Sequence, residues 1–335
     1  ESIATEFYKA LGVNPYTNTI TSLANTGNFD PNMRFLINEV IREAVIAGIQ
    51  TRPLYQSLIR AEEFITQTQI TMPDIKIPDA YMKKTGEMES ITTGSVSFGS
   101  KVAKISKYAG GINLSDEVVK YVSINLLSLY LEGIGTSLGV SLDIEAINTL
   151  INGEDASGAA SAPVIGAETA NSLVYGDLLT AWIRLNTLGQ SPQLMLGDEA
   201  TTKHIMQMEE FKKPMSQGMS GTNPSNLAAP ALRMNTPLPT QLDFYSHGVM
   251  PANSLLLVNR NQALLQFTAS ALRIESDRNI QSQFNSYTAS LTTGFATVKR
   301  DARLVIDYSK SFATNGFPDY MDIAAYQKAG FRKSS

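Results

Sequence analysis

The sequence has no cysteine and little charge. Without cysteine the chain has no disulfide framework, no thiolate metal site and no cysteine nucleophile. Charged residues make up only 17% of the chain, against about 25% in average soluble domains. A weakly charged surface is typical of a chain that buries much of its surface against other chains. The 27 basic and 31 acidic residues leave a net charge of −4, which excludes the concentrated positive field that nucleic-acid binding requires.

Signals for a membrane are missing as well. The chain opens at Glu1 without the basic and apolar regions of a signal peptide, and the absence of an initial Met favours an N-terminus trimmed by processing. The most apolar stretch, residues 121–142, contains Glu132, Asn125 and several serines, which a membrane span of about 20 residues avoids. We therefore interpret this stretch as a helix buried by protein.

With 335 residues, 43% of them apolar, the chain can bury one large core or two smaller ones. Residues 1–30 are turn-rich and predict an irregular arm. A helix is then expected from Asp30, the N-cap, and Pro31, the first helical residue, as far as Gly48. Its apolar residues have the spacing of a buried stripe: Ile37, Val40, Ile41, Ala44 and Val45.

Next comes a thin β excursion. Residues 64–77 and 91–106 favour two strands, joined by a polar turn that contains Lys83 and Lys84. A lysine pair in such a turn is usually a solvated loop tip. An isolated hairpin is marginally stable in water, so this excursion must lie on something else.

A long helix is predicted from Ser115, as N-cap, to about Asn152, with Gly153 as the stop signal. Three glycines interrupt its pattern without ending it. We expect small residues there to let another backbone approach the helix closely; they are Gly133, Gly135 and Gly139.

The rest of the chain predicts an α/β segment and then a run of strands. A small-residue loop at 153–172 precedes a helix near 176–188, and residues 211–239 are expected to form a mobile loop rich in Met and Pro. The other expected elements are a strand at 194–196, a helix at 199–208, strands at 254–258, 263–267, 271–276, 287–298 and 303–307, and a short helix at 319–329.

Two motifs resemble enzyme sites. Ser137 lies in a G-x-S-x-G sequence with His204 and His247 downstream, as in a serine hydrolase. That motif requires a strand, a sharp turn and a helix, whereas Ser137 lies inside a helical pattern, and the same objection applies to a dinucleotide-binding loop at 133–139. The two histidines have no patterned third ligand, so we expect no metal.

Residues Arg273, Glu275 and Asp277 alternate along a predicted strand, which places three charges on one face. Surface charges are mostly inert, so a solvent-facing edge would explain them. A charged contact between subunits is the sharper hypothesis.

Taken in order, these parts resemble the major capsid proteins of tailed bacteriophages with the HK97-type fold. The arm, the β excursion, the long helix, the α/β insertion and the closing strands all fit, over about residues 30–308. The stretches that carry the resemblance are residues 110–117, 141–143, 249–258, 271–280 and 293–307.

The resemblance implies an α+β fold with five parts. They are an N-terminal arm and helix (1–63), an extended loop (64–108), a peripheral domain with a long spine helix (109–153 and 251–308), an axial α/β domain (154–250) and a C-terminal tail (309–335).

The same resemblance implies a structural protein, not an enzyme, with no cofactor. Copies would form pentamers and hexamers of an icosahedral phage head, made in the host cytoplasm, which encloses double-stranded DNA without sequence-specific binding. Further implied partners are a portal, a scaffold or maturation protease, and a decoration protein. Candidate contacts between subunits are Lys83, Lys84, Arg273, Glu275, Asp277 and Arg278.

Two alternatives stay open at this point. An encapsulin-like bacterial compartment would share the fold and enclose a protein cargo. A serine hydrolase centred on Ser137 is the alternative from another class. Some relatives cross-link a loop lysine to an asparagine of a neighbour, but the partner asparagine and the catalytic acid have no match here, so we predict no such bond.

Overall fold

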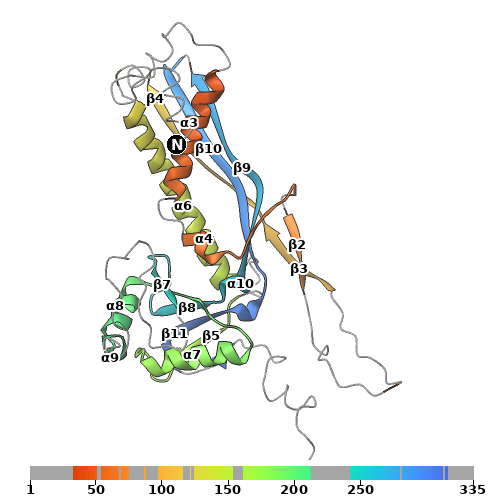
Figure 1. Ribbon diagram of the computed structural model, residues 1–335, viewed down its shortest axis with the longest axis vertical. Helices are drawn as coiled ribbons and strands as arrows, with labels where there is room; N and C mark the ends of the chain where they lie inside the picture. Colours follow the sequence, from red (N-terminus) through yellow and green to blue (C-terminus); the bar gives the residue numbers. More distant parts are fainter. Residues whose placement is uncertain are drawn as a thin grey trace, which may run out of the picture.

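The computed structural model describes residues 33–50, 54–67, 69–74, 87, 97–115, 121, 124–153, 161–212, 242–279, 281–311 and 314–315. Figure 1 shows an elongated molecule with a long sheet at one end and a second sheet at the other. The long sheet has four strands in the order β1-β9-β10-β4. Their bounds are Glu62–Phe64 (β1), Leu264–Asn279 (β9), Phe284–Thr297 (β10) and Ser106–Ser115 (β4).

One face of the long sheet is apolar and the other is polar. On β9, Leu272 and Ile274 pack against the core, whereas the alternating residues Arg273 and Glu275 are exposed. This alternation follows from the two-residue period of a strand. The predicted strands 263–267 and 271–276 are therefore two parts of one long strand.

Two helices cover the apolar face, α3 (Met33–Gln50) and α6 (Ile124–Asn152). Both were predicted, and Gly153 ends α6 with φ +81°. The strand β4 was missed here, and Ser115, the predicted N-cap of the helix, is the last residue of that strand. Residues 116–120, the predicted first turn of the helix, lie outside the described residues.

The two helices touch backbone to backbone through glycines. A Cβ atom added to Gly135 would lie 2.1 Å from the Val45 carbonyl oxygen, and one added to Gly48 would lie 2.1 Å from the Glu132 oxygen. At Gly139 the approach is looser, since an added Cβ atom would lie 3.3 Å from the Ile49 carbonyl oxygen, and at Gly133 it would meet nothing within 4 Å. The predicted role of the small residues is therefore confirmed for Gly135 and Gly139 and wrong for Gly133, and α6 runs through all three without a break.

The second sheet is mixed, with six strands in the order β12-β5-β11-β8-β6-β7. The helix α7 (Tyr175–Thr187) packs on it, and α8 (Glu199–Gln207) and α9 (Glu209–Lys212) follow β6. Its central strand β8 is buried at every position, as its Leu-rich sequence predicts. The strand bounds are Thr314–Asn315 (β12), Val164–Ala167 (β5), Arg303–Ser311 (β11), Ser254–Val258 (β8), Leu194–Gly197 (β6) and Asp243–Ser246 (β7).

Arg303, the first residue of β11, ties the mixed sheet to α6. Its side chain is fully buried, and its Nη1 atom donates to the carbonyl oxygens of Thr149 and Leu150 at 2.8 and 2.9 Å. These carbonyls lie in the last turn of α6, where the helix dipole is negative, and the Thr149 oxygen also accepts from the Gly153 N–H at 2.9 Å. The guanidinium group therefore stabilises the end of the spine helix.

Asp143 fastens a short helix, α4 (Leu54–Leu58), to the side of α6. Its carboxylate is 3% exposed, and the Oδ1 atom accepts a hydrogen bond of 2.7 Å from the backbone N–H of Tyr55. First-turn amides of a helix need such an acceptor. Burial raises the pKa of Asp143 to about 6, and the Tyr55 hydrogen bond opposes this shift only in part.

We expect Asp143→Asn to remove a pH dependence of stability. Because the folded-state pKa lies above the unfolded value, the folded chain holds the extra proton between pH 4 and 6. The stabilisation is therefore complete below about pH 4 and is lost as pH rises through about 6, by up to about 3 kcal/mol. The amide variant keeps an acceptor for Tyr55 and should lack this slope in urea unfolding followed from pH 4 to 7. If stability falls with pH equally in the wild type and in the Asp143→Asn protein, the pH dependence does not come from Asp143.

Three predicted features lie wholly or mostly outside the described residues: the arm at 1–30, the helix at 319–329 and the loop at 211–239, of which residues 211 and 212 belong to α9. Within the described ranges, every helix is too short or too polar to pass through a lipid bilayer.

Candidate assembly surfaces

A narrow ribbon leaves the body of the molecule. Its strands β2 (Gln69–Asp74) and β3 (Ser97–Lys104) pair only with each other in an antiparallel sheet, with Asp74 opposite Ser97. Figure 1 shows the ribbon standing apart from both larger sheets. The prediction of a two-stranded excursion is confirmed.

The root of the ribbon does have support within its own molecule. Ala103 and Ile105 are buried against Phe267 and Ala296 of the long sheet. Next to them, the Phe64 side chain is 75% exposed. The range 64–108 is therefore anchored at its base on its own molecule, so the expectation that the whole excursion lies on something else is wrong at its root.

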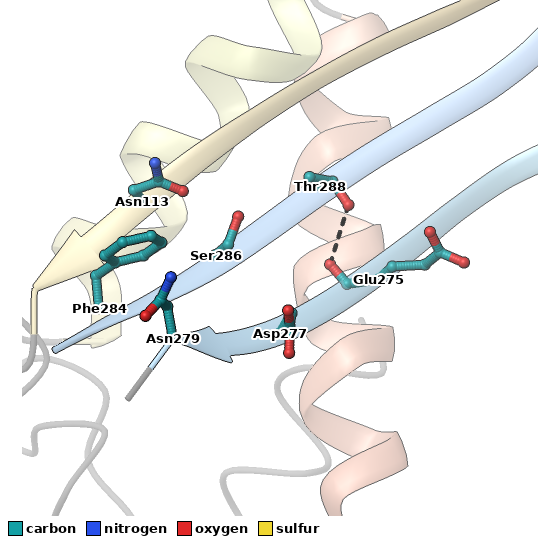
Figure 2. A pocket seen from close by; sticks show the side chains of 7 residues that line it. All are labelled: Asn113, Glu275, Asp277, Asn279, Phe284, Ser286 and Thr288. Atoms are coloured by element: carbon teal, nitrogen blue, oxygen red, sulfur yellow. Dashed lines mark hydrogen bonds between the residues drawn. The ribbon is translucent and has the colours of Figure 1, made fainter. Parts of the chain in front are cut away.

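The polar face of the long sheet carries a shallow hollow at the tip of the β9–β10 hairpin. We call it the tip hollow, and its volume is about 460 Å³. Figure 2 shows its side chains on β4, β10 and β9, with the helices behind the strands. The lining residues are Asn113, Glu275, Asp277, Asn279, Phe284, Ser286 and Thr288.

Strand register brings the polar residues of the tip hollow together. Asp277 lies opposite Ser286, which lies opposite Asn113 on the other side, so three strands place these side chains in one row. Thr288 donates from its Oγ1 atom to the Glu275 carbonyl oxygen at 3.3 Å. Sequence reasoning missed Asn113 and Ser286, because alternation gives the face of a residue but not its partner across the sheet.

Of the six predicted contact residues, the structure places three on this polar face. Arg273 and Glu275 form an ion pair of 2.9 Å with exposed side chains, and Asp277 is exposed beside the tip hollow. Arg278 lies in β9, but its side chain is outside the described residues, as are Lys83 and Lys84.

The structure does not form the hydrolase site considered from the sequence. Ser137 is an exposed residue inside α6, so the strand, turn and helix of a nucleophile elbow are absent around it. His204 bonds through Nε2 with the Leu173 carbonyl oxygen at 2.8 Å. Burial lowers the pKa of His247, whose Nδ1 accepts from the Val249 N–H. Across the described ranges, no cluster of three or more potential metal ligands occurs.

A family model described as phage capsid protein matches residues 99–306, more than half of the chain. The chain belongs to this family. The match begins within β3 and includes three of the four strands of the long sheet (β4, β9 and β10), the spine helix α6 and most of the mixed sheet. The resemblance stated from the sequence is thereby confirmed, and the capsid protein is a structural component of the phage head.

Solved structures show the same fold at low sequence identity. The capsid chain of the cyanophage P-SCSP1u is 13% identical with a TM-score of 0.55, over 77% of this chain and 89% of that chain. The capsid of an empty GTA particle is 13% identical with a TM-score of 0.54, over 76% and 90%. A virus-like particle from Pyrococcus furiosus is 11% identical with a TM-score of 0.52, over 81% and 99%. No curated protein matches the chain.

Proposed function

We propose that the capsid protein assembles into pentamers and hexamers that close into an icosahedral phage head around double-stranded DNA. The β2–β3 ribbon is the observation that carries the proposal. It leaves the body, forms a sheet of two strands in the part of the chain that the structure describes, and packs on the body at its root through Ala103 and Ile105. An isolated pair of strands is marginal in water, so the ribbon gains its stability by lying on a neighbouring copy.

The surface that receives the ribbon is proposed to be the peripheral domain of the neighbour. Lys83 and Lys84 are contact candidates from the ribbon. On the body, the contact candidates are the charged residues of β9, namely Arg273, Glu275, Asp277 and Arg278. The exposed stretch of β9 from Arg273 to Asp277 supports a role in contacts between subunits, because its charged side chains are open to another chain.

The division into parts follows the arrangement inferred from the sequence. Residues 1–63 form the arm and first helix, 64–108 the extended loop, and 309–335 the tail. Residues 109–153 and 251–308 form the peripheral domain, and 154–250 the axial domain. The strands β8 and β11 from the peripheral range lie inside the mixed sheet beside β6 and β5, so the two domains share that sheet.

Assembly takes place in the host cytoplasm, with a portal at one vertex and a scaffold or maturation protease during head formation. A decoration protein is a further partner. The capsid protein itself works mechanically rather than as an enzyme. Its net charge of −4 supports a container that encloses DNA without gripping each phosphate.

Negative-stain electron microscopy of the purified protein tests the proposal. Closed particles or capsomers are expected, and a protein that stays monomeric at high concentration would contradict the proposal.

Replacing residues 75–96 by Asn-Gly should abolish assembly, because this change removes the far part of the ribbon. The direct pairing of Asp74 with Ser97 permits a two-residue turn at that place. The shortened protein should keep the thermal midpoint of unfolding of the wild type. A separate variant with Lys83→Ala and Lys84→Ala tests the contribution of the two lysines to assembly.

A further inference from the structure

A second hollow, which we call the basic hollow, lies at the base of the long sheet. It has a volume of about 480 Å³ and forms where the end of α4 meets α10 (Arg260–Ala263) and the turn before η2 (Arg300–Ala302). Its lining consists of Arg60, Asn261, Gln262, Val298 and Lys299. Both charged residues in this lining are cations.

Backbone hydrogen bonds hold three distant chain segments together around the basic hollow. The Arg60 N–H donates to the Leu264 carbonyl oxygen at 2.8 Å, and the Val298 N–H donates to that of Ala263 at 3.0 Å. The Lys299 N–H donates to the Gln262 carbonyl oxygen at 3.2 Å. The positions of Arg60 and Lys299 are thus set by the fold and not by flexible loops.

A chain of amide side chains then orients Lys299. Asn259, 5% exposed, donates from Nδ2 to Gln190 Oε1 at 2.9 Å, and Gln190, 4% exposed, donates from Nε2 to Gln262 Oε1 at 3.2 Å. The same Gln262 oxygen accepts from Lys299 Nζ at 2.8 Å. Because an ammonium group has three N–H donors, two remain for a ligand. This arrangement is preorganised to bind an anion.

Positive charge gathers at this corner. Arg260 and Arg300 flank the hollow on α10 and η2. Within the part of the chain that the structure describes, neither of them nor Arg60 nor Lys299 forms an ion pair. Unneutralised cations of this kind favour a partner that supplies negative charge.

We propose that the basic hollow binds the carboxylates of Glu275 and Asp277 from a second copy of the chain. The inference rests on the proposed self-assembly and names the partner of these two residues. A compact hollow lined by two cations and two amides fits one or two carboxylates, whereas a nucleic-acid backbone calls for an extended basic track. Glu275 already pairs with Arg273, and a carboxylate has acceptor capacity for further donors.

The length of the sheet makes the contact intermolecular. β9 begins at Leu264, beside the basic hollow, and ends at Asn279, in the lining of the tip hollow. Its 16 residues span about 50 Å at roughly 3.3 Å per residue. The acidic end of one molecule can therefore reach the basic end only of another molecule. Such a head-to-tail contact uses two different patches and can close into rings.

Charge reversal tests the pairing. Arg60→Glu with Lys299→Glu, and separately Glu275→Lys with Asp277→Lys, should each raise the protein concentration needed for assembly by about tenfold or more. The protein with all four changes should return to within about threefold of wild type, because the attraction is rebuilt with opposite signs. Assembly is measured by light scattering and electron microscopy, and folding by circular dichroism and thermal unfolding. Lys203→Glu, at an exposed position of α8, is the charge-matched control for Lys299→Glu.

The outcomes separate this inference from the proposed function. A wild-type protein that never assembles contradicts the proposed function itself. If wild type assembles and either reversed pair is folded yet assembles normally, the proposed pairing is overturned. Folded reversed pairs that both fail, with no rescue in the combined protein, overturn it too. If Arg60→Glu with Lys299→Glu leaves assembly intact but lowers the DNA retained in particles, the hollow binds phosphate instead.

Discussion

Gly135→Ala is expected to lower the free energy of unfolding by about 2 kcal/mol. The added Cβ atom would lie 2.1 Å from the Val45 carbonyl oxygen, far inside contact distance, and that oxygen belongs to a helix backbone. A backbone atom cannot rotate away as a side chain can, so α3 and α6 must separate. Overpacking typically costs about 1–3 kcal/mol, occasionally more, and alanine recovers about 1 kcal/mol through its helix propensity. Urea unfolding of the unassembled protein measures the difference.

Gly133 offers a matched control on the same helix. A Cβ atom added there meets nothing within 4 Å, so Gly133→Ala makes the same chemical change without the clash. It should leave stability unchanged or raise it by up to about 1 kcal/mol. Equal changes in stability at Gly133 and Gly135 would show that the close approach of α3 and α6 is not the cause of the loss. Because α3 is held to α6 at this contact, Gly135→Ala should also impair assembly.

Arg303→Met should destabilise the capsid protein by about 3–4 kcal/mol. Methionine keeps much of the side-chain volume but removes both hydrogen bonds to the last turn of α6. The carbonyl oxygens of Thr149 and Leu150 would then lose a charged donor in a buried setting, and the helix dipole would lose a cation at its negative end. The midpoint of urea unfolding should fall, with the slope unchanged.

Two further substitutions show whether the guanidinium contact is the cause. Arg303→Lys keeps a cationic donor and should cost about half as much. Arg273→Met makes the same change at a side chain that is 71% exposed, and should alter stability by less than about 0.5 kcal/mol in the unassembled protein. A loss at Arg303 no larger than that at Arg273 would contradict the role given to the buried guanidinium.

Several elements could be predicted because their signals are local. α7 and α8 lie within one residue of their expected bounds, since apolar spacing and the adjacent Gly189 and Asp198 mark their ends. β8 was clear from a run of apolar residues. β4 was missed because Gly110 and Gly111 weaken its strand pattern. β5 and β7 were missed because they lack the run of large apolar residues that marked β6, a strand of the same length.

The candidate site was accessible only in part. Alternation along β9 was enough to place Arg273, Glu275 and Asp277 on one exposed face, because the two-residue period of a strand is a local property. The basic hollow could not be found in this way. Arg60 and Lys299 are distant in sequence and share no motif, and their common place in the lining depends on backbone hydrogen bonds between distant segments.

The sequence by itself determined the periodic elements, the polar and apolar faces of β9, and the small residues along α6, because each depends on neighbours within a few positions. Only the tertiary structure decided which backbone fills the space at Gly135, that a lone arginine in an apolar strand closes the spine helix, and that the two charged hollows lie at opposite ends of one sheet. Those features arise from the pairing of distant segments, and local patterns of side chains do not encode register or helix contact directly.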